Sequence, residues 1–160
     1  MTDIEVCYEN FQAALNIYDR ELKKIENGEE SPLDRTEATK YKFHIHGRLG
    51  ELYSMDQKYD ESIEEFRTVV KLASDFDHPE TLRIISEAHF RIGNALLHQN
   101  NSSCEELAIQ DYIWAVECLI RYMNEVERYD TEKFEVPSLE NSRVDRYHYL
   151  NGPKDSEMIA

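Results

Sequence analysis

The chain has 160 residues, of which 33 are acidic and 18 basic, so its formal net charge at pH 7 is −15. This charge disfavours direct binding to nucleic acids and to anionic membranes, because both require clustered lysine and arginine side chains. With 41% hydrophobic residues, 32% charged residues, 5 glycines and 4 prolines, the composition indicates one globular domain rich in long helices and excludes wholesale disorder.

Five amphipathic helices are predicted in chain order, because apolar residues recur at steps of three and four. Their predicted ranges are 3–26, 36–55, 60–75, 79–97 and 105–129. Thr36, with Thr39 nearby, is expected to cap the second helix, and Pro79 with an aspartate cap before it suits the first turn of the fourth.

Two of these helices carry apolar faces that we expect to be buried. In the second helix the face consists of Tyr41, Ile45, Leu49, Leu52 and Tyr53. In the fifth helix it consists of Leu107, Tyr112, Val116, Leu119, Ile120, Met123 and Val126.

The periodicity fades near the C-terminal end of the sequence. Residues 1–130 are therefore expected to form one helical repeat domain, and residues 131–160 a weakly structured tail with one short helix near 141–150. Cys7, Cys104 and Cys118 show no close pairing and are expected to be free thiols. Because the sequence has no apolar run of membrane-spanning length and no signal peptide, we expect a nuclear or cytoplasmic protein.

An internal repeat is visible once the helices are placed. The second and third helices carry the tetratricopeptide order, in which a Leu-Gly pair and an aromatic residue precede a small residue and a second aromatic residue. These positions are Leu49, Gly50, Tyr53, Ser62 and Phe66. The fourth and fifth helices repeat the order with Ile92, Gly93, Leu96, Tyr112, Ala115 and Leu119. The fold class predicted is all-α with tetratricopeptide-like helical hairpins, although a plain helical bundle would also place small residues at crossings.

The repeat is interrupted compared with a standard array. Gly50 and Gly93 lie 43 positions apart, whereas the standard period is about 34 residues. A second insertion is expected between Gly93 and Ala115.

Two segments resemble the nuclear autoantigenic sperm protein family of histone chaperones, which have interrupted tetratricopeptide repeats. They are LGELYSMDQKYDESIEEFRTVVKL (Leu49–Leu72) and EAHFRIGNAL (Glu87–Leu96). The resemblance covers roughly Phe11–Met123 and implies a histone chaperone that binds the core histone pair of the central nucleosome tetramer. The sequence departs from the family in having no long acidic tract and no basic import signal.

The first helix of each repeat is expected to line a concave groove. Helix-face spacing places His44, Gly47, Glu51 and Met55 there from one repeat, and Glu87, Phe90, Asn94 and Leu97 from the next. We expect this groove to be acidic with apolar spots, which suits a basic ligand.

The resemblance implies histone contacts at particular groove positions. The acidic contacts correspond to Glu51 and Glu87, the aromatic contact to Phe90, and Met55 with the adjacent Asp56 stands where the family often has another acid. The candidate partner-binding set is Glu51, Met55, Asp56, Glu87, Phe90 and Asn94. In the alternative interpretation the glutamates are solvated surface charges, and Phe90 and Met55 belong to the core.

The sequence indicates no catalytic or metal site. His44 and His46 are two residues apart, so on a helix they point to different faces, and neither a glycine-rich phosphate loop nor a nucleophile with a positioned base is recognisable. We therefore expect a protein that is not an enzyme and that uses no metal and no cofactor.

Two other functions stay open at this point. An adaptor for acidic C-terminal tails would need lysine and arginine in the groove, where the expected residues include Gly47, Glu51 and Phe90. A tetratricopeptide scaffold within a larger complex, or a homo-oligomer, is favoured by the incomplete repeat count, because an open end of the array exposes apolar surface.

Overall fold

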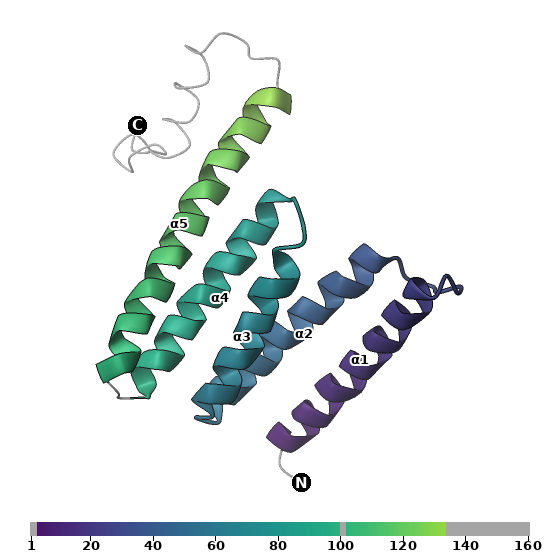
Figure 1. Ribbon diagram of the computed structural model, residues 1–160, viewed down its shortest axis with the longest axis horizontal. Coiled ribbons are helices and arrows are strands. Elements are labelled where there is room, and N and C mark those ends of the chain that lie inside the picture. The colour runs from purple at the N-terminus through teal and green to yellow at the C-terminus, as the bar shows by residue number, and fades with distance from the viewer. Residues whose placement is uncertain (1–2, 100–101, 134–160) are drawn as a thin grey trace, which may run out of the picture. The chain divides into compact units, whose positions relative to one another are not determined.

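The computed structural model describes residues 3–99 and 102–133. These residues form five α-helices and no β-strand (Figure 1): α1 (Asp3–Glu26), α2 (Arg35–Met55), α3 (Tyr59–Ala73), α4 (Pro79–His98) and α5 (Ser102–Lys133). The predicted all-α fold of helical hairpins is confirmed. The predicted tail lies outside the described residues, including its short helix near 141–150, except that residues 131–133 complete α5.

The chain divides into two compact units, Met1–Met123 and Asn124–Ala160. Within the first unit, consecutive helices pack against one another, from α1 on α2 through to α3 on α4. α4 also contacts α5, and one of these contacts is a hydrogen bond of 2.6 Å from Ser86 Oγ to the carbonyl oxygen of Ala115. In the described part of the chain, no helix combines the length and the apolar character needed to cross a bilayer.

The starts of α2 and α4 carry side-chain caps that differ slightly from expectation. Asp34, not Thr36, caps α2, because the helix begins one residue earlier and Asp34 Oδ1 accepts a hydrogen bond of 2.7 Å from the Glu37 N–H. His78 caps α4 through Nδ1, which accepts from the Glu80 N–H at 3.2 Å. Pro79 occupies the first turn of α4, as predicted.

The core lies where α2, α3 and α4 meet, and glycines allow the close crossings. A Cβ atom added to Gly50 would lie 2.9 Å from the ring of Phe66, and one added to Gly93 would lie 2.7 Å from the ring of Tyr112. Both rings therefore lie directly against a helix backbone.

A second pair of contacts shows that the two hairpins are repeats of one unit. His46 Nδ1 lies 2.6 Å from Glu65 Oε2, and His89 Nδ1 lies 2.7 Å from Asp111 Oδ1. Together with the glycine contacts, these pairs relate α2 to α4 by 43 positions and α3 to α5 by 46 positions.

This relation corrects the predicted register of α5. Ala108, not Ala115, corresponds to Ser62. Ser62 and Ala108 are both fully buried, and each lies four residues before the aromatic ring that covers the glycine. The second hairpin therefore has three more residues between its glycine and its small buried residue than the first hairpin has. They form an extra helical turn at the start of α5, where a longer loop was expected.

The predicted buried faces of α2 and α5 are partly wrong. Tyr41 is exposed and stacks on Tyr18 with ring centroids 5.2 Å apart, while Phe43 is in the core instead. Within residues 103–128 of α5, the buried positions are Ala108, Asp111 and Ala115. The apolar residues expected inside α5 are largely exposed, namely Leu107, Val116, Leu119, Ile120 and Met123.

All three cysteines are free, as predicted. Cys7 is exposed on α1, whereas burial raises the pKa of the Cys118 thiol above its usual range. At neutral pH Cys118 is therefore a packed thiol without the thiolate character that reactivity requires.

Candidate partner-binding groove

A hollow with a volume of about 250 Å³ lies between α2 and α4, the first helices of the two hairpins. We call this surface the α2/α4 groove. It is lined by Phe43, His44, Gly47, Arg48, Glu51, Phe66, Val69, Arg83, Ile84, Glu87 and Ala88. Phe66 and Val69 come from α3, and with Phe43 of α2 and Ile84 of α4 they give the lining apolar side chains as well as charged ones.

Two neighbouring hollows share residues with the groove. One, toward the C-terminal ends of α2 and α4, is lined by Glu51, Ser54, Met55, Phe66, Arg91, Asn94 and His98. The other, between α4 and α5, is lined by Arg83, Ser86, Glu87, Phe90, Tyr112, Ala115, Val116 and Leu119.

The structure thus brings five of the six predicted site residues onto this connected surface: Glu51, Met55, Glu87, Phe90 and Asn94. Asp56 lines none of these three hollows. It is the C-cap residue of α2, and its Oδ2 lies 2.6 Å from Lys58 Nζ.

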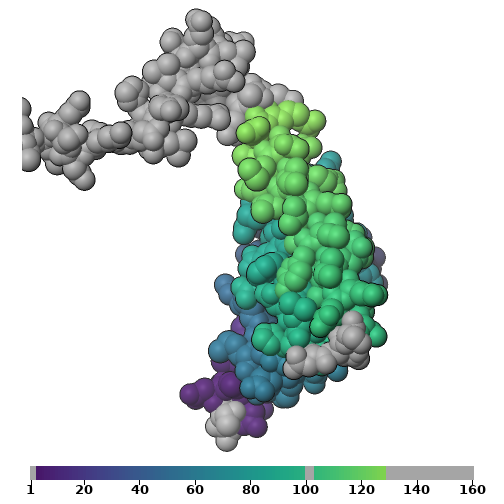
Figure 2. Space-filling model, turned by 90° about the vertical axis from the view of Figure 1, so that its left-hand side faces the viewer, coloured from purple at the N-terminus to yellow at the C-terminus, as the bar shows by residue number. Residues whose placement is uncertain are grey.

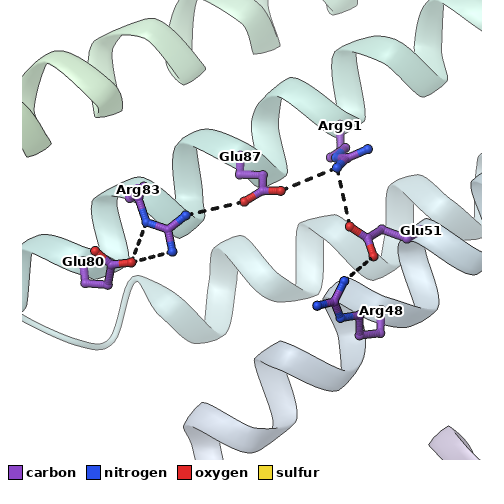
Figure 3. A network of polar contacts seen from close by, with 6 residues as sticks. All are labelled: Arg48, Glu51, Glu80, Arg83, Glu87 and Arg91. Atoms are coloured by element: carbon purple, nitrogen blue, oxygen red, sulfur yellow. Dashed lines mark hydrogen bonds and ion pairs between the residues drawn. The ribbon is translucent and has the colours of Figure 1, made fainter.

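The charged residues of the groove belong to a network that also includes Arg91 of the neighbouring hollow and Glu80 of α4 (Figure 3). Glu51 lies between two arginines, with Oε2 2.8 Å from Arg48 Nη1 and Oε1 3.5 Å from Arg91 Nη2. Glu87 lies 3.6 Å from Arg91 and 3.8 Å from Arg83, which also pairs with Glu80. Arg91 therefore joins the carboxylates of two different helices.

This network overturns the expectation of an acidic groove. Three glutamates and three arginines are present in it, so its formal charge is zero. The excess negative charge of the chain lies elsewhere.

Sequence reasoning missed the three arginines. Arg48 with Glu51, and Arg83 with Glu87, stand at the three- and four-residue spacings at which opposite charges pair along a helix, so this part of the network was detectable. The contact between Arg91 and Glu51 joins α4 to α2 and required the tertiary structure.

His44 on the groove wall adds no positive charge at pH 7. Partial burial lowers the pKa of its imidazole, and the nearby Arg48 and Arg83 guanidinium groups lower it further. The ring is therefore neutral, and the charge of the groove at this pH comes from its arginines and glutamates.

The apolar part of the surface is held in place by one tyrosine. The Tyr112 ring lies 5.7 Å from the ring of Phe90, and its hydroxyl donates a hydrogen bond of 2.7 Å to Asn94 Oδ1. Burial raises the pKa of Tyr112, which keeps the hydroxyl protonated as a donor. Phe90 and Met55 are both exposed, so neither belongs to the core.

In the described ranges 3–99 and 102–133, no group of three or more histidine, cysteine, aspartate or glutamate side chains is arranged to hold a metal ion. His46 contacts Glu65 on α3, and the lining of the groove does not include it.

No protein-family model matches the chain, and no curated protein matches it significantly. The resemblance to the nuclear autoantigenic sperm protein family therefore stays a prediction from the residues.

Proposed function

We propose that this protein is a histone chaperone, a non-catalytic binder that holds the core histone pair of the central nucleosome tetramer in the α2/α4 groove. One observation carries the proposal. Glu51 and Glu87 come from two different helices, meet at the shared Arg91, and lie beside the exposed apolar side chains of Met55 and Phe90. On this surface a basic helix or tail can pair its lysine or arginine side chains with the glutamates and pack its apolar side chains against Met55 and Phe90.

The arginines in the network do not prevent a basic ligand from binding. Arg48, Arg83 and Arg91 are exposed, and an exposed ion pair contributes only about 0–1 kcal/mol. Lysine or arginine side chains of a ligand can therefore replace them on Glu51 and Glu87 at little cost. The glutamates are already held in position before the ligand arrives, which reduces the entropy lost on binding.

Long-range attraction comes from the rest of the chain. Because the groove network is neutral, the net charge of −15 lies outside it. A field of this sign raises the association rate of a cationic partner, while the groove determines which segment docks.

The test is binding of the full chain to the refolded histone pair at about 0.3 M salt, where charges farther apart than a few ångström are screened. Size exclusion with light scattering measures the stoichiometry. The variant Glu51→Lys, Glu87→Lys is expected to weaken the complex by about tenfold or more, since each lysine repels the ligand and loses an anchor.

A matched control reverses two glutamates outside the groove. Glu61→Lys, Glu64→Lys on the exposed face of α3 makes the same change in net charge. It should retain binding at this salt concentration. Equal losses in both variants would mean that only net charge matters, and an undiminished complex in the groove variant would place the contact on another surface.

The arginines also favour a second candidate, an adaptor that binds an acidic peptide. Arg48 and Arg83 line the groove, Arg91 lines the neighbouring hollow, and guanidinium groups bind carboxylates well. The variant Arg48→Glu, Arg91→Glu separates the two functions. It abolishes binding of an acidic C-terminal peptide to an adaptor, whereas it leaves or strengthens histone binding to a chaperone.

A further inference from the structure

α5 has two apolar faces, and the described structure covers one of them. The face toward α4 contains Ala108, Asp111 and Ala115, all buried. A second face, about a third of a turn around the helix from the first, carries apolar residues at alternating steps of four and three, all exposed: Ile109, Ile113, Val116, Ile120 and Met123. We call these five residues the outer stripe of α5. In Figure 2, α5 (green) faces the viewer with no other coloured helix in front of it.

The repeat shows what normally covers such a face. Shifted by 46 positions, Ile63 and Ala73 of α3 correspond to Ile109 and Leu119 of α5. On α3 they are 4% and 0% exposed in the core shared with α4, whereas their counterparts on α5 are 59% and 43% exposed. Val70 and Val116 correspond in the same way, half-buried against exposed. At Ile109, Val116 and the neighbouring Leu119, α5 therefore repeats the surface that receives α4 on α3, and no helix of the described residues lies on it. Ile113 and Ile120 extend the stripe at positions where α3 has the exposed Arg67 and Ser74.

The shape of the missing occupant follows from this repeat. A helix that lies on α5 as α4 lies on α3 meets a stripe of four- and three-residue steps over about four turns, which is the spacing of helix-on-helix packing. A helix that is apolar on two faces normally packs against neighbours on both of them.

The charge of the occupant follows from the acids beside the stripe. Glu105, Glu106 and Glu117 are exposed on α5 near it, against one exposed base, Arg121, in the same stretch. In the repeat, Glu106 of α5 corresponds to Asp60 of α3. The carboxylate of Asp60 accepts a hydrogen bond of 2.5 Å from Gln99, which directly follows α4. A second copy of the chain, with its own charge of −15, would be repelled.

We propose that the outer stripe of α5 binds an amphipathic helix of a partner protein, one with apolar residues at three- and four-residue spacing and lysine or arginine along its flanks. The helical form of the partner rests on the repeat alone. Its basic character agrees with and deepens the proposed function, because a basic ligand would then contact α5 as well as the α2/α4 groove.

The experiment uses the full chain and two fluorescent synthetic helical peptides of about 20 residues. Both peptides share one apolar face, and one carries lysine and the other glutamate at the flanking positions. Fluorescence anisotropy is expected to show binding of the lysine peptide about tenfold tighter than the glutamate peptide. Ile109→Ser, Val116→Ser should weaken it about tenfold, because these are the stripe residues whose counterparts on α3 pack on α4, and both side chains are exposed on α5.

Two controls separate the stripe from other effects. Val6→Ser, Ile17→Ser removes exposed apolar side chains from α1 and should leave peptide binding unchanged. Glu51→Lys, Glu87→Lys should also bind the peptide, so that a failure of the histone proposal and a failure of the stripe proposal give different results.

Several outcomes would overturn the proposal. Equal binding of both peptides, or binding that survives the serine substitutions, would mean that the stripe is not the site, since serine leaves the net charge unchanged. A dimer that light scattering detects and that Ile109→Ser, Val116→Ser dissociates would identify a second copy as the occupant. A monomer that binds neither peptide would mean that another part of the chain covers the stripe.

Discussion

At the scale of single residues, two histidines hold acidic side chains between the helices of each hairpin. His89 and Asp111 join α4 to α5, and their side chains are 14% and 11% exposed. The equivalent His46 and Glu65 join α2 to α3, with the Glu65 side chain 23% exposed. A carboxylate that loses its hydrogen-bond partner costs more stability the less water can reach it.

We therefore predict that His89→Phe lowers the free energy of unfolding by about 1–3 kcal/mol, because Asp111 stays buried without this partner. His46→Phe should cost less, since Glu65 is more accessible to water. Urea unfolding of the two variants and the parent chain measures the difference. Equal losses in both variants would contradict the argument from burial.

At the scale of helices, each hairpin depends on the close approach of a glycine to an aromatic ring. Gly50 and Gly93 both lie under rings that are packed in or against the core, so the rings have little room to move. Gly47 is in the same helix as Gly50, but the nearest atom to an added Cβ there is Val69 Cγ2 at 3.9 Å. This is an ordinary van der Waals distance.

Gly50→Ala and Gly93→Ala are each predicted to destabilise the fold by about 1–3 kcal/mol, because the added methyl group forces the helices apart or the rings out of place. Gly47→Ala is the matched control and should be neutral or stabilising by up to about 1 kcal/mol, as alanine favours the helix. Thermal or urea unfolding distinguishes them. A loss of stability at Gly47 equal to that at Gly50 would show that the crossing contact is not the cause.

At the scale of the whole molecule, the dominant feature is the net charge of −15 on 160 residues. Many of the described ion pairs connect residues three or four apart on one helix, where each contributes little. Repulsion between the remaining acids therefore opposes the compact state.

Added salt is consequently expected to stabilise the protein. Raising sodium chloride from about 20 mM to about 500 mM shortens the Debye length to a few ångström and should raise the thermal midpoint by a few degrees. Scanning calorimetry or circular dichroism measures the shift, and the same osmolarity of sucrose controls for general exclusion effects. A midpoint that falls with salt would mean that ion pairs outweigh the repulsion.

The sequence alone determined the all-α fold, the approximate bounds of five helices and the two glycine crossings, and it selected five residues of the connected groove surface. These features depend on local periodicity, on the order of small and aromatic residues, and on which residues share a helix face. They can be read without knowing which helices are neighbours.

Only the tertiary structure decided the register of α5, the neutral charge of the groove and the exposure of the outer stripe. Ala108 takes the place of Ser62 because Tyr112 is the ring that reaches Gly93, and Arg91 meets Glu51 because α4 lies beside α2. The apolar pattern of α5 predicted a buried face, but burial requires a second helix to supply the contacts. Each of these features depends on residues far apart in the chain, and periodicity along one helix contains no information about its neighbours.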